Sequence, residues 1–269
     1  MVHDFDASLT FYSVERPFNC SKEISMLLML LFTSSYAVTV YLLSIQFIYR
    51  YLALFNENVL FLFSGFYNII WFILGGFVMF LWGFSIYYHG DRNQYSFLYL
   101  SKEFSDSYNL TISDIPYFSA IIYERDNSIH WNGVKMMGSL AIIVSILYGI
   151  IVFCGIVIQL KIPEQLNTFS EKNRVVQKQL FTVLVAQISV PTLIIFLPVM
   201  TMYIIPFLNI KISFPASIIV CLLSVYPAVD SIIVMFILSD YRKAVKKIYY
   251  RCTCQRNRIY NISSNGQPT

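Results

Sequence analysis

Charged residues are scarce in this chain, and their scarcity excludes a soluble globular domain of ordinary composition. Only 13% of the 269 residues are Asp, Glu, Lys or Arg, whereas soluble domains carry about a quarter. Hydrophobic residues make up 57% and aromatic residues 17%, and the mean hydropathy is +0.61. These values indicate an integral membrane protein with many side chains at lipid-facing and interfacial positions.

The motifs of common enzyme classes are also missing from the sequence. The three histidines, His3, His89 and His130, are scattered without metal-ligand spacing. There is no nucleotide-binding loop, no H-E-x-x-H motif and no pair of intramembrane carboxylates. We therefore expect that the protein is not an enzyme, that it has no metal site or cofactor, and that it has no nucleic-acid partner.

Long apolar segments are what the sequence has in abundance. Five of them reach the roughly 20 residues that a membrane-spanning helix requires. The expected spans are 24–49, 59–88, 136–160, 179–207 and 212–239, within a transmembrane domain of residues 1–250 that precedes a cytoplasmic tail of residues 251–269. The sequence therefore predicts an all-α membrane protein with five transmembrane helices.

The distribution of Lys and Arg predicts the orientation of these helices. Basic residues gather in the 161–178 loop and after residue 239, whereas the long loop before residue 136 is rich in Asp and Glu. Cytoplasmic segments carry an excess of Lys and Arg. We therefore expect the amino terminus outside the cell and the carboxyl terminus in the cytoplasm.

With this orientation, four residues lie on the side of the membrane where their modification is expected. The Asn19-Cys-Ser and Asn109-Leu-Thr sequons fall outside, where N-glycosylation of Asn19 and Asn109 is expected. Cys252 and Cys254 follow a basic amphipathic stretch, 240–251, that is typical of a helix lying on the inner leaflet. Thiols at such a place are expected palmitoylation sites.

A carboxylate, Asp230, lies near the middle of the fifth span. Ionisable groups in this position are costly, rare and usually functional. It follows Pro227 by one turn and precedes the inner end by roughly 15 Å. Two interpretations stay open: a residue that helps to switch the packing of the helices, or a structural hydrogen bond between them.

Three stretches together resemble the nematode serpentine chemoreceptors of the str class and its sister class srj. Residues 16–55 ("RPFNCSKEISMLLMLLFTSSYAVTVYLLSIQFIYRYLALF") resemble the third transmembrane helix of that family. Residues 178–199 ("KQLFTVLVAQISVPTLIIFLPV") resemble the sixth, and residues 226–245 ("YPAVDSIIVMFILSDYRKAV") resemble the seventh. Two features depart from the family. The chain lacks counterparts of the first two helices, and Ser231 stands where a proline is common.

The resemblance implies that the five spans correspond to helices three to seven of a G-protein-coupled receptor bundle. It also implies an olfactory-type chemosensory receptor that detects a small-molecule odorant or soluble cue and signals to a heterotrimeric G protein. The expected location is the plasma membrane of sensory neuron cilia. The residues implied in switching and coupling are Tyr49, Arg50, Pro227, Asp230, Tyr241 and Arg242. The candidate pocket residues, chosen for depth and type, are Phe32, Tyr36, Tyr148 and Tyr203.

Other functions stay open at this point. The chain could be a truncated membrane protein without signalling ability, arising from an incomplete gene model or acting as a trafficking partner for intact receptors. A small transporter is a weaker alternative, because a single intramembrane charge is sparse for an ion path and no inverted repeat is visible. Arg50 could also serve only as an anchor whose charge reaches the headgroup layer.

Overall fold

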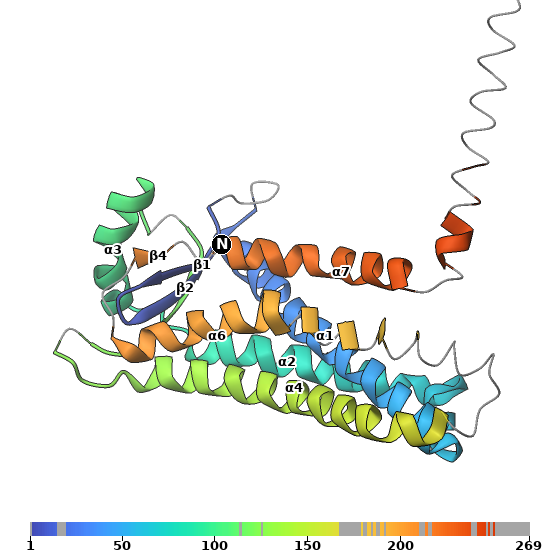
Figure 1. Cartoon of the computed structure of the whole chain (residues 1–269). Helices are drawn as coiled ribbons and strands as arrows, with labels where there is room; N and C mark the ends of the chain where they lie inside the picture. Colours follow the sequence, from blue (N-terminus) through green and yellow to red (C-terminus); the bar gives the residue numbers. More distant parts are fainter. Residues whose placement is uncertain are drawn as a thin grey trace, which may run out of the picture.

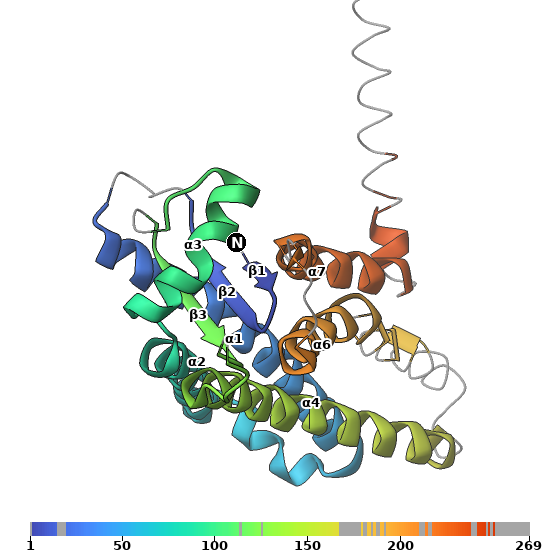
Figure 2. The same cartoon turned by 90° about the vertical axis from the view of Figure 1, so that its left-hand side faces the viewer.

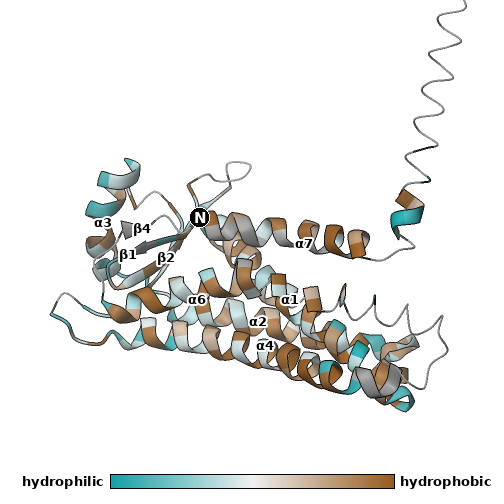
Figure 3. Cartoon of the chain, in the orientation of Figure 1, coloured by the Kyte–Doolittle hydropathy of each residue, from teal (hydrophilic) through white to brown (hydrophobic). Residues whose placement is uncertain are grey.

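A small antiparallel sheet lies at one end of several long helices (Figure 1). The computed structural model describes residues 2–14, 20–112, 115–124, 126–166, 192–209, 213–214, 217–237 and 241–245, together with isolated positions from 179 to 190 and at 247 and 250. The helices carry most of the apolar residues, whereas the helix beside the sheet is more hydrophilic (Figure 3).

Three of the described helices are long and apolar enough to cross a membrane. They are α1 (Lys22–Phe55), α2 (Asn68–His89), whose apolar run starts at Gly65, and α4 (Trp131–Leu166). The Ser21 hydroxyl caps the start of α1 by accepting a hydrogen bond from the Ile24 amide at 3.4 Å. These helices confirm the expected class, a mainly helical membrane protein.

The beginning of the expected second span is not α-helical. The structure has two 3₁₀ turns there, η2 (Glu57–Phe63) and η3 (Gly65–Tyr67), ahead of α2. Ser64 is extended between them, and Gly65 has a φ of +55°, which disfavours any residue with a Cβ. The apolar run is therefore continuous in sequence while the helix is not, and hydropathy does not detect that difference.

The later part of the chain contains shorter described elements. A π-helical turn, η4 (Thr192–Phe196), leads into α6 (Leu197–Ile204) and the 3₁₀ turn η5 (Ile205–Leu208). The strand β4 (Ser213–Phe214) and the helix α7 (Ser217–Ile237) follow. Much of the expected span 179–207 before Thr192 lies outside the described residues. The count of five spans and their correspondence to helices three to seven therefore stay a prediction.

Small residues allow the three long helices to pack closely. α1 contacts both α2 and α4, and α2 contacts α4. Gly75 lies against the ring of Tyr41, since an added Cβ there would approach Tyr41 Cε1 to 2.9 Å. The Tyr41 hydroxyl donates to the Trp71 carbonyl at 2.6 Å, and the hydroxyls of Ser85 and Ser139 hydrogen-bond between α2 and α4. Close approach and interhelical hydrogen bonds are what hold helices together in lipid.

The sheet was not predicted from the sequence, which led us to expect an all-α protein. Its strands are β1 (Val2–Phe5), β2 (Ser8–Tyr12), β3 (Tyr117–Ile121) and β4, in the order β3-β2-β1-β4 with antiparallel pairing. Asp6, with a φ of 51°, turns the chain between β1 and β2. Opposite residues of β2 and β3 pair through the hydroxyls of Thr10 and Ser119, 3.0 Å apart.

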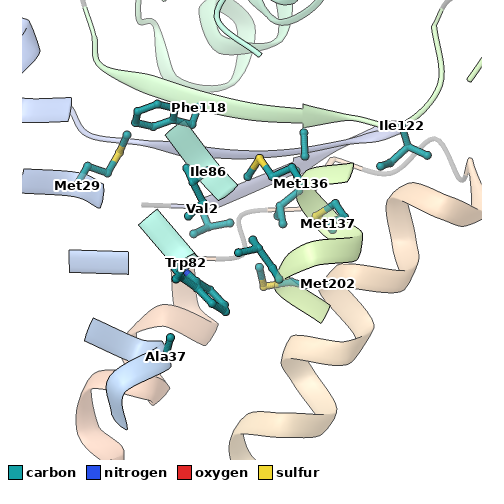
Figure 4. Packing of buried hydrophobic residues seen from close by; sticks show 13 residues of the cluster. Val2, Met29, Ala37, Trp82, Ile86, Phe118, Ile122, Met136, Met137 and Met202 are labelled. Carbon is teal, nitrogen blue, oxygen red and sulfur yellow. The ribbon is translucent and has the colours of Figure 1, made fainter. Parts of the chain in front are cut away.

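The two faces of the sheet are covered by different elements. One face packs on the long helices, where Val2 and Phe118 lie among side chains such as Trp82 and Met137 (Figure 4), and Leu9 belongs to the same cluster. The other face is covered by the helix α3 (Gln94–Tyr108) (Figure 2). The cluster on that face contains Tyr12, Tyr99, Leu100, Phe104, Ile112, Ile115, Tyr117 and Ile121.

The strands come from three separate parts of the sequence. β1 and β2 lie at the amino terminus, β3 lies between α2 and α4, and β4 lies between η5 and α7. Because the strands pair in one sheet, these three parts lie on the same side of the helices. The distribution of charged residues assigned all three to one side, and the sheet now shows how that side is built.

Candidate ligand-binding and coupling regions

Two of the expected pocket residues, Phe32 and Tyr36, lie together on α1 near α7. Their rings contact edge to face with centroids 5.2 Å apart. The Tyr36 hydroxyl lies 3.4 Å from the Ser224 hydroxyl of α7, a weak hydrogen bond between distant segments. Phe32 is half exposed and Tyr36 is half-buried. The pair therefore marks the boundary between α1 and α7.

The third expected residue, Tyr148, joins α4 to the π-helical turn. Its ring stacks on Phe196 with centroids 4.2 Å apart and an interplanar angle of 7°. Its hydroxyl hydrogen-bonds with the hydroxyl of Thr192 at the start of the same turn. π-Helical turns are rare and frequently occur at functional sites. Both ends of this turn are thus held by one tyrosine.

The fourth expected residue, Tyr203, has different neighbours from the other three. It is half-buried on α6 and packs against the cluster of buried residues that contains Trp82, Met136 and Met202. This cluster continues into the sheet through Val2 and Leu9. Tyr203 is therefore placed where a change in α6 would reach the sheet. The two described cavities are lined by none of the four expected pocket residues.

The opposite end of α1 carries Tyr49 and Arg50. Tyr49 is exposed, and its ring contacts Phe63 of η2 edge to face at 5.3 Å. Phe63 in turn stacks on Trp71, whose indole N–H donates to the Leu62 carbonyl at 2.9 Å. Arg50, the next residue after Tyr49, is half-buried. The aromatic row fixes the turn after α1 and so determines where the Arg50 end of the helix lies.

The remaining expected coupling residues lie at or after α7. Pro227 and Asp230 belong to α7, but their side chains lie outside what the structure describes. Tyr241 and Arg242 are exposed in the helical residues 241–245. Among the expected coupling residues, the described contacts do not join the α1 end with α7, and the interhelical role expected for Asp230 stays a prediction.

Only one of the four expected modification sites lies within the described residues. Asn109 is exposed and ends α3 in the left-handed conformation, with a φ of 53°. Its backbone amide donates to the Ser105 carbonyl at 3.0 Å, so its side chain is not needed to cap the helix. Asn19, Cys252 and Cys254 lie outside the described residues.

Buried polar groups at the sheet end were missed by the sequence analysis. His3, on the face of β1 that α3 covers, is almost fully buried. Its Nε2 lies 3.3 Å from Glu103 Oε1, and its Nδ1 is hydrogen-bonded with the Tyr108 hydroxyl at 2.8 Å. Burial lowers the pKa of His3, although the nearby Glu103 carboxylate opposes the shift. Recognising a strand at residues 2–5 would have identified His3 as a buried residue, because a strand places His3 on the same face as Phe5.

A second buried pair lies where α2 leads toward α3. Asp91 Oδ1 is 3.5 Å from His130 Nε2, and the backbone of Asp91 pairs with that of Ser119. Burial raises the pKa of Asp91, while the charge of His130 acts in the opposite direction. The pair ties the start of α4 to the end of α2.

Comparison with known proteins identifies the family. Residues 1–246 match the family described as serpentine type 7TM GPCR chemoreceptor Str. The chain belongs to the Str family. This family consists of G-protein-coupled chemoreceptors and is not a class of enzymes, so the chain is a multi-pass protein of the plasma membrane.

Individual relatives support the Str assignment. The chain is 33% identical over 255 residues to "G-protein coupled receptor str-33" of Caenorhabditis elegans, covering 92% of this chain and 74% of the relative. It is 24% identical over 241 residues to "Serpentine receptor class r-10" of Caenorhabditis elegans, covering 88% of this chain and 71% of that protein. The Caenorhabditis briggsae protein of the same name is 24% identical over 256 residues, covering 93% and 74%. No solved structure matches the chain.

Proposed function

We propose that this Str-family chain detects a small-molecule cue, an odorant or soluble compound, and signals to a heterotrimeric G protein. The observation that carries the proposal is the family match over residues 1–246, which includes every span expected from the sequence. The proposed location is the plasma membrane of sensory neuron cilia, with the amino terminus outside and the carboxyl terminus in the cytoplasm.

The cue binds between the helices on the side of the sheet. Support comes from the contacts that two tyrosines make with distant segments. The Tyr36 hydroxyl hydrogen-bonds with Ser224, and Tyr148 hydrogen-bonds with Thr192 and stacks on Phe196. A cue that inserts beside either tyrosine competes with a hydrogen bond between helices. A ligand can shift a conformational equilibrium only through such a difference in contacts.

The signal leaves at the opposite end, where Tyr49 and Arg50 complete the first spanning helix. A π-helical turn such as Thr192–Phe196 is a point at which a helix can bend, and α6 follows it directly. Asp230 on α7 is the second proposed switch residue, with Pro227 one turn earlier. Movement of α6 and α7 relative to α1 would expose the Arg50 end to the G protein, together with Tyr241 and Arg242.

The proposed orientation predicts N-glycosylation on the outer side and palmitoylation on the cytoplasmic side. Asn109 is exposed at the end of α3, on the side of the sheet, and is the better supported N-glycosylation site; Asn19 is the other. Cys252 and Cys254 are proposed to carry palmitoyl groups on the cytoplasmic side.

The test is a cue screen in cells that express the chain with a G protein and a calcium reporter. Pools of volatile and water-soluble small molecules are applied, and surface protein is quantified in parallel. We expect at least one pool to evoke a response, and Arg50→Ala to reduce it by about tenfold at equal surface level. Lys161→Ala is the matched control, since Lys161 is also a basic residue near the same end, placed over the Phe55 ring. A response that Arg50→Ala leaves unchanged would reduce Arg50 to an anchor, and silence toward every pool would contradict the receptor function.

A further inference from the structure

The described residues between β3 and α4, 122–124 and 126–130, form a narrow hairpin that we call the strap. Tyr123 and Ile129 pair across it in an antiparallel bridge. Backbone hydrogen bonds of 2.9 Å join Glu124 to Ser128, Asn127 to Glu124 and His130 to Ile122. The strap follows β3 directly and leads directly into α4. It therefore has a defined shape and a base that is anchored on both sides.

Two side chains of the strap reach the sheet end of α6, at the turn η5 (Figure 1). The Tyr123 hydroxyl donates to the Phe207 carbonyl at 3.3 Å, and the Asn209 side-chain amide donates to Asn127 Oδ1 at 3.3 Å. Asn127, Phe207 and Asn209 are exposed, so water competes for these hydrogen bonds. Each bond therefore contributes little to stability and can open without unfolding the chain.

The other end of α6 is held by α4 itself. The Tyr148 ring stacks on Phe196, and the Tyr148 hydroxyl hydrogen-bonds with Thr192, both in the π-helical turn η4 that directly precedes α6. Since α6 has 8 residues, it rises about 12 Å between its two ends. It is thus a short rod, and both of its ends are attached to one continuous segment, the strap and α4.

Between these two ends, apolar contacts hold α6. Among the described elements, its backbone has its main contacts with the flanking turns η4 and η5. Val199, Met202 and Tyr203 add side chains to the buried cluster of Figure 4. Apolar packing is not directional, and methionine side chains adapt to irregular gaps. The position of α6 on this surface is therefore set largely by the directional contacts at its ends.

We propose that the strap holds the sheet end of α6 in the resting receptor, and that release of Tyr123 and Asn127 from η5 lets α6 pivot about the π-helical turn η4. A π-helical turn is a place where a helix bends. The contacts at η5 are two exposed hydrogen bonds, whereas the contact at η4 adds a stacked aromatic pair, so the η5 end opens first. The effect on signalling rests on the proposed function, whereas the restraint on α6 is a property of the fold.

A double variant that removes both strap contacts tests the restraint. Tyr123→Phe with Asn209→Gly keeps the backbone, because Asn209 has a φ of 50°, which glycine adopts readily. The matched control is Tyr88→Phe with Asn109→Gly, since Tyr88 is exposed on α2 and Asn109 has a φ of 53°. The full chain is produced in bacteria, so that no variant carries a glycan, and hydrogen exchange is measured in detergent. We expect amides 197–208 to exchange about fivefold faster in the release variant than in the control.

Hydrogen exchange can overturn the proposal in two ways. Equal exchange of residues 197–208 in the two double variants would show that the strap does not restrain α6. Acceleration of the same size in α1 and α4 would show that the two hydrogen bonds are ordinary parts of the fold, because a release confined to α6 leaves those helices protected.

Crosslinking tests whether the strap controls the resting state. In a background without the five natural cysteines, Asn127→Cys and Asn209→Cys are joined by a short thiol crosslinker that a reductant cleaves. Each protein is reconstituted with a heterotrimeric G protein, and its basal nucleotide exchange is measured. We expect the release variant to exceed its control about threefold, and the crosslinked protein to fall below the same protein after reduction.

The two levels of the proposal fail in different ways. Equal nucleotide exchange by the released and the crosslinked proteins, above the rate of the G protein alone, would overturn the role of the strap in the resting state. If every variant and the unmodified chain gave the rate of the G protein alone, the proposed coupling would be contradicted. Hydrogen exchange would then still decide whether the strap holds α6.

Discussion

At the residue scale, Tyr148 shows what sequence reasoning can and cannot supply. Its depth in an apolar segment and its residue type made it a candidate. Its partners, Thr192 and Phe196, lie more than forty residues away on a π-helical turn that hydropathy does not predict. Single-residue candidates follow from composition, whereas their contacts depend on how distant segments pack.

The first prediction concerns this hydrogen bond. Thr192→Val removes the hydroxyl while keeping the shape, and Tyr148→Phe removes the other partner. Each is expected to cost about 1 kcal/mol of stability, measured by thermal unfolding in detergent. The double variant should cost little more than either single one, because both remove the same bond. Thr201→Val is the control, since the Thr201 hydroxyl bonds only within its own helix to Leu197. If the stability loss of the double variant equalled the sum of the two single losses, Tyr148 and Thr192 would not stabilise the fold through this hydrogen bond.

A glycine near the start of α4 gives a second prediction. A Cβ at Gly133 would lie 1.9 Å from the Ile121 carbonyl oxygen of β3, so α4 can approach the sheet only with glycine there. Gly133→Ala is expected to lower stability by about 1–3 kcal/mol through overpacking. Gly138→Ala, where the added Cβ meets nothing within 4 Å, should leave the unfolding temperature unchanged or slightly raised. Equal behaviour of the two variants would mean that α4 does not pack on β3 as described.

At the element scale, the three long helices α1, α2 and α4 were predictable and the sheet was not; its strand β4 lies where the fifth span was expected to begin. The spans follow from long apolar runs without charge. The strands are short, and Ser8, Leu9 and Thr10 are all buried because both faces of the sheet are covered. Ser8-Leu9-Thr10-Phe11 does alternate polar and apolar residues, but this run is about as short as an alternation that identifies a strand can be. The turn at Asp6-Ala7 also lacks the glycine that usually indicates a hairpin.

The helix α3 was also missed, although its sequence carries a signal. Tyr95, Tyr99, Phe104 and Tyr108 recur at intervals of four or five residues, and all pack in or against the cluster that covers the sheet. Asn93 before it caps the helix, because its side chain accepts a hydrogen bond from the Ser96 amide at 3.1 Å. A capping residue followed by such spacing predicts an amphipathic helix.

The third prediction concerns the contact between β1 and α3 at His3. Because burial lowers the pKa of His3 in the folded state, the unfolded state binds more protons as the pH falls below about 6.5. The contribution of His3 to stability is therefore present at neutral pH and lost on acidification. Hydrogen exchange of the β1 amides, corrected for its intrinsic pH dependence, should be faster at pH 5 than at pH 7.5.

Two variants check the origin of this pH effect. His3→Gln cannot titrate, so the difference between the two pH values should shrink. His89→Gln, at the end of α2, where the His89 ring contacts Tyr88 and not Glu103 or Tyr108, should leave the difference as it is in the unmodified chain. Should both variants keep the full difference, another group is responsible for the acid sensitivity.

At the scale of the whole molecule, the sheet explains why one end of the helices differs from the other. Its four strands join the amino terminus, the α2–α4 connection and the η5–α7 connection. The opposite end has no counterpart of this sheet among the described residues, and it carries the aromatic row from Tyr49 to Trp71. Composition predicted the membrane class, and charge predicted that these three segments lie at the same end of the helices. The pairing of strands from three distant segments required the tertiary structure.

The central claim is that the sheet end faces outward to meet the cue and that the Arg50 end faces the G protein inside. Single cysteines test it most directly, in a background from which the five natural cysteines have been removed. Ser105→Cys on α3 and Asn58→Cys in η2 are both exposed positions, one at each end. A membrane-impermeant maleimide should label Ser105→Cys on intact cells and Asn58→Cys only after permeabilisation. The reverse pattern would contradict the orientation and the receptor function that depends on it.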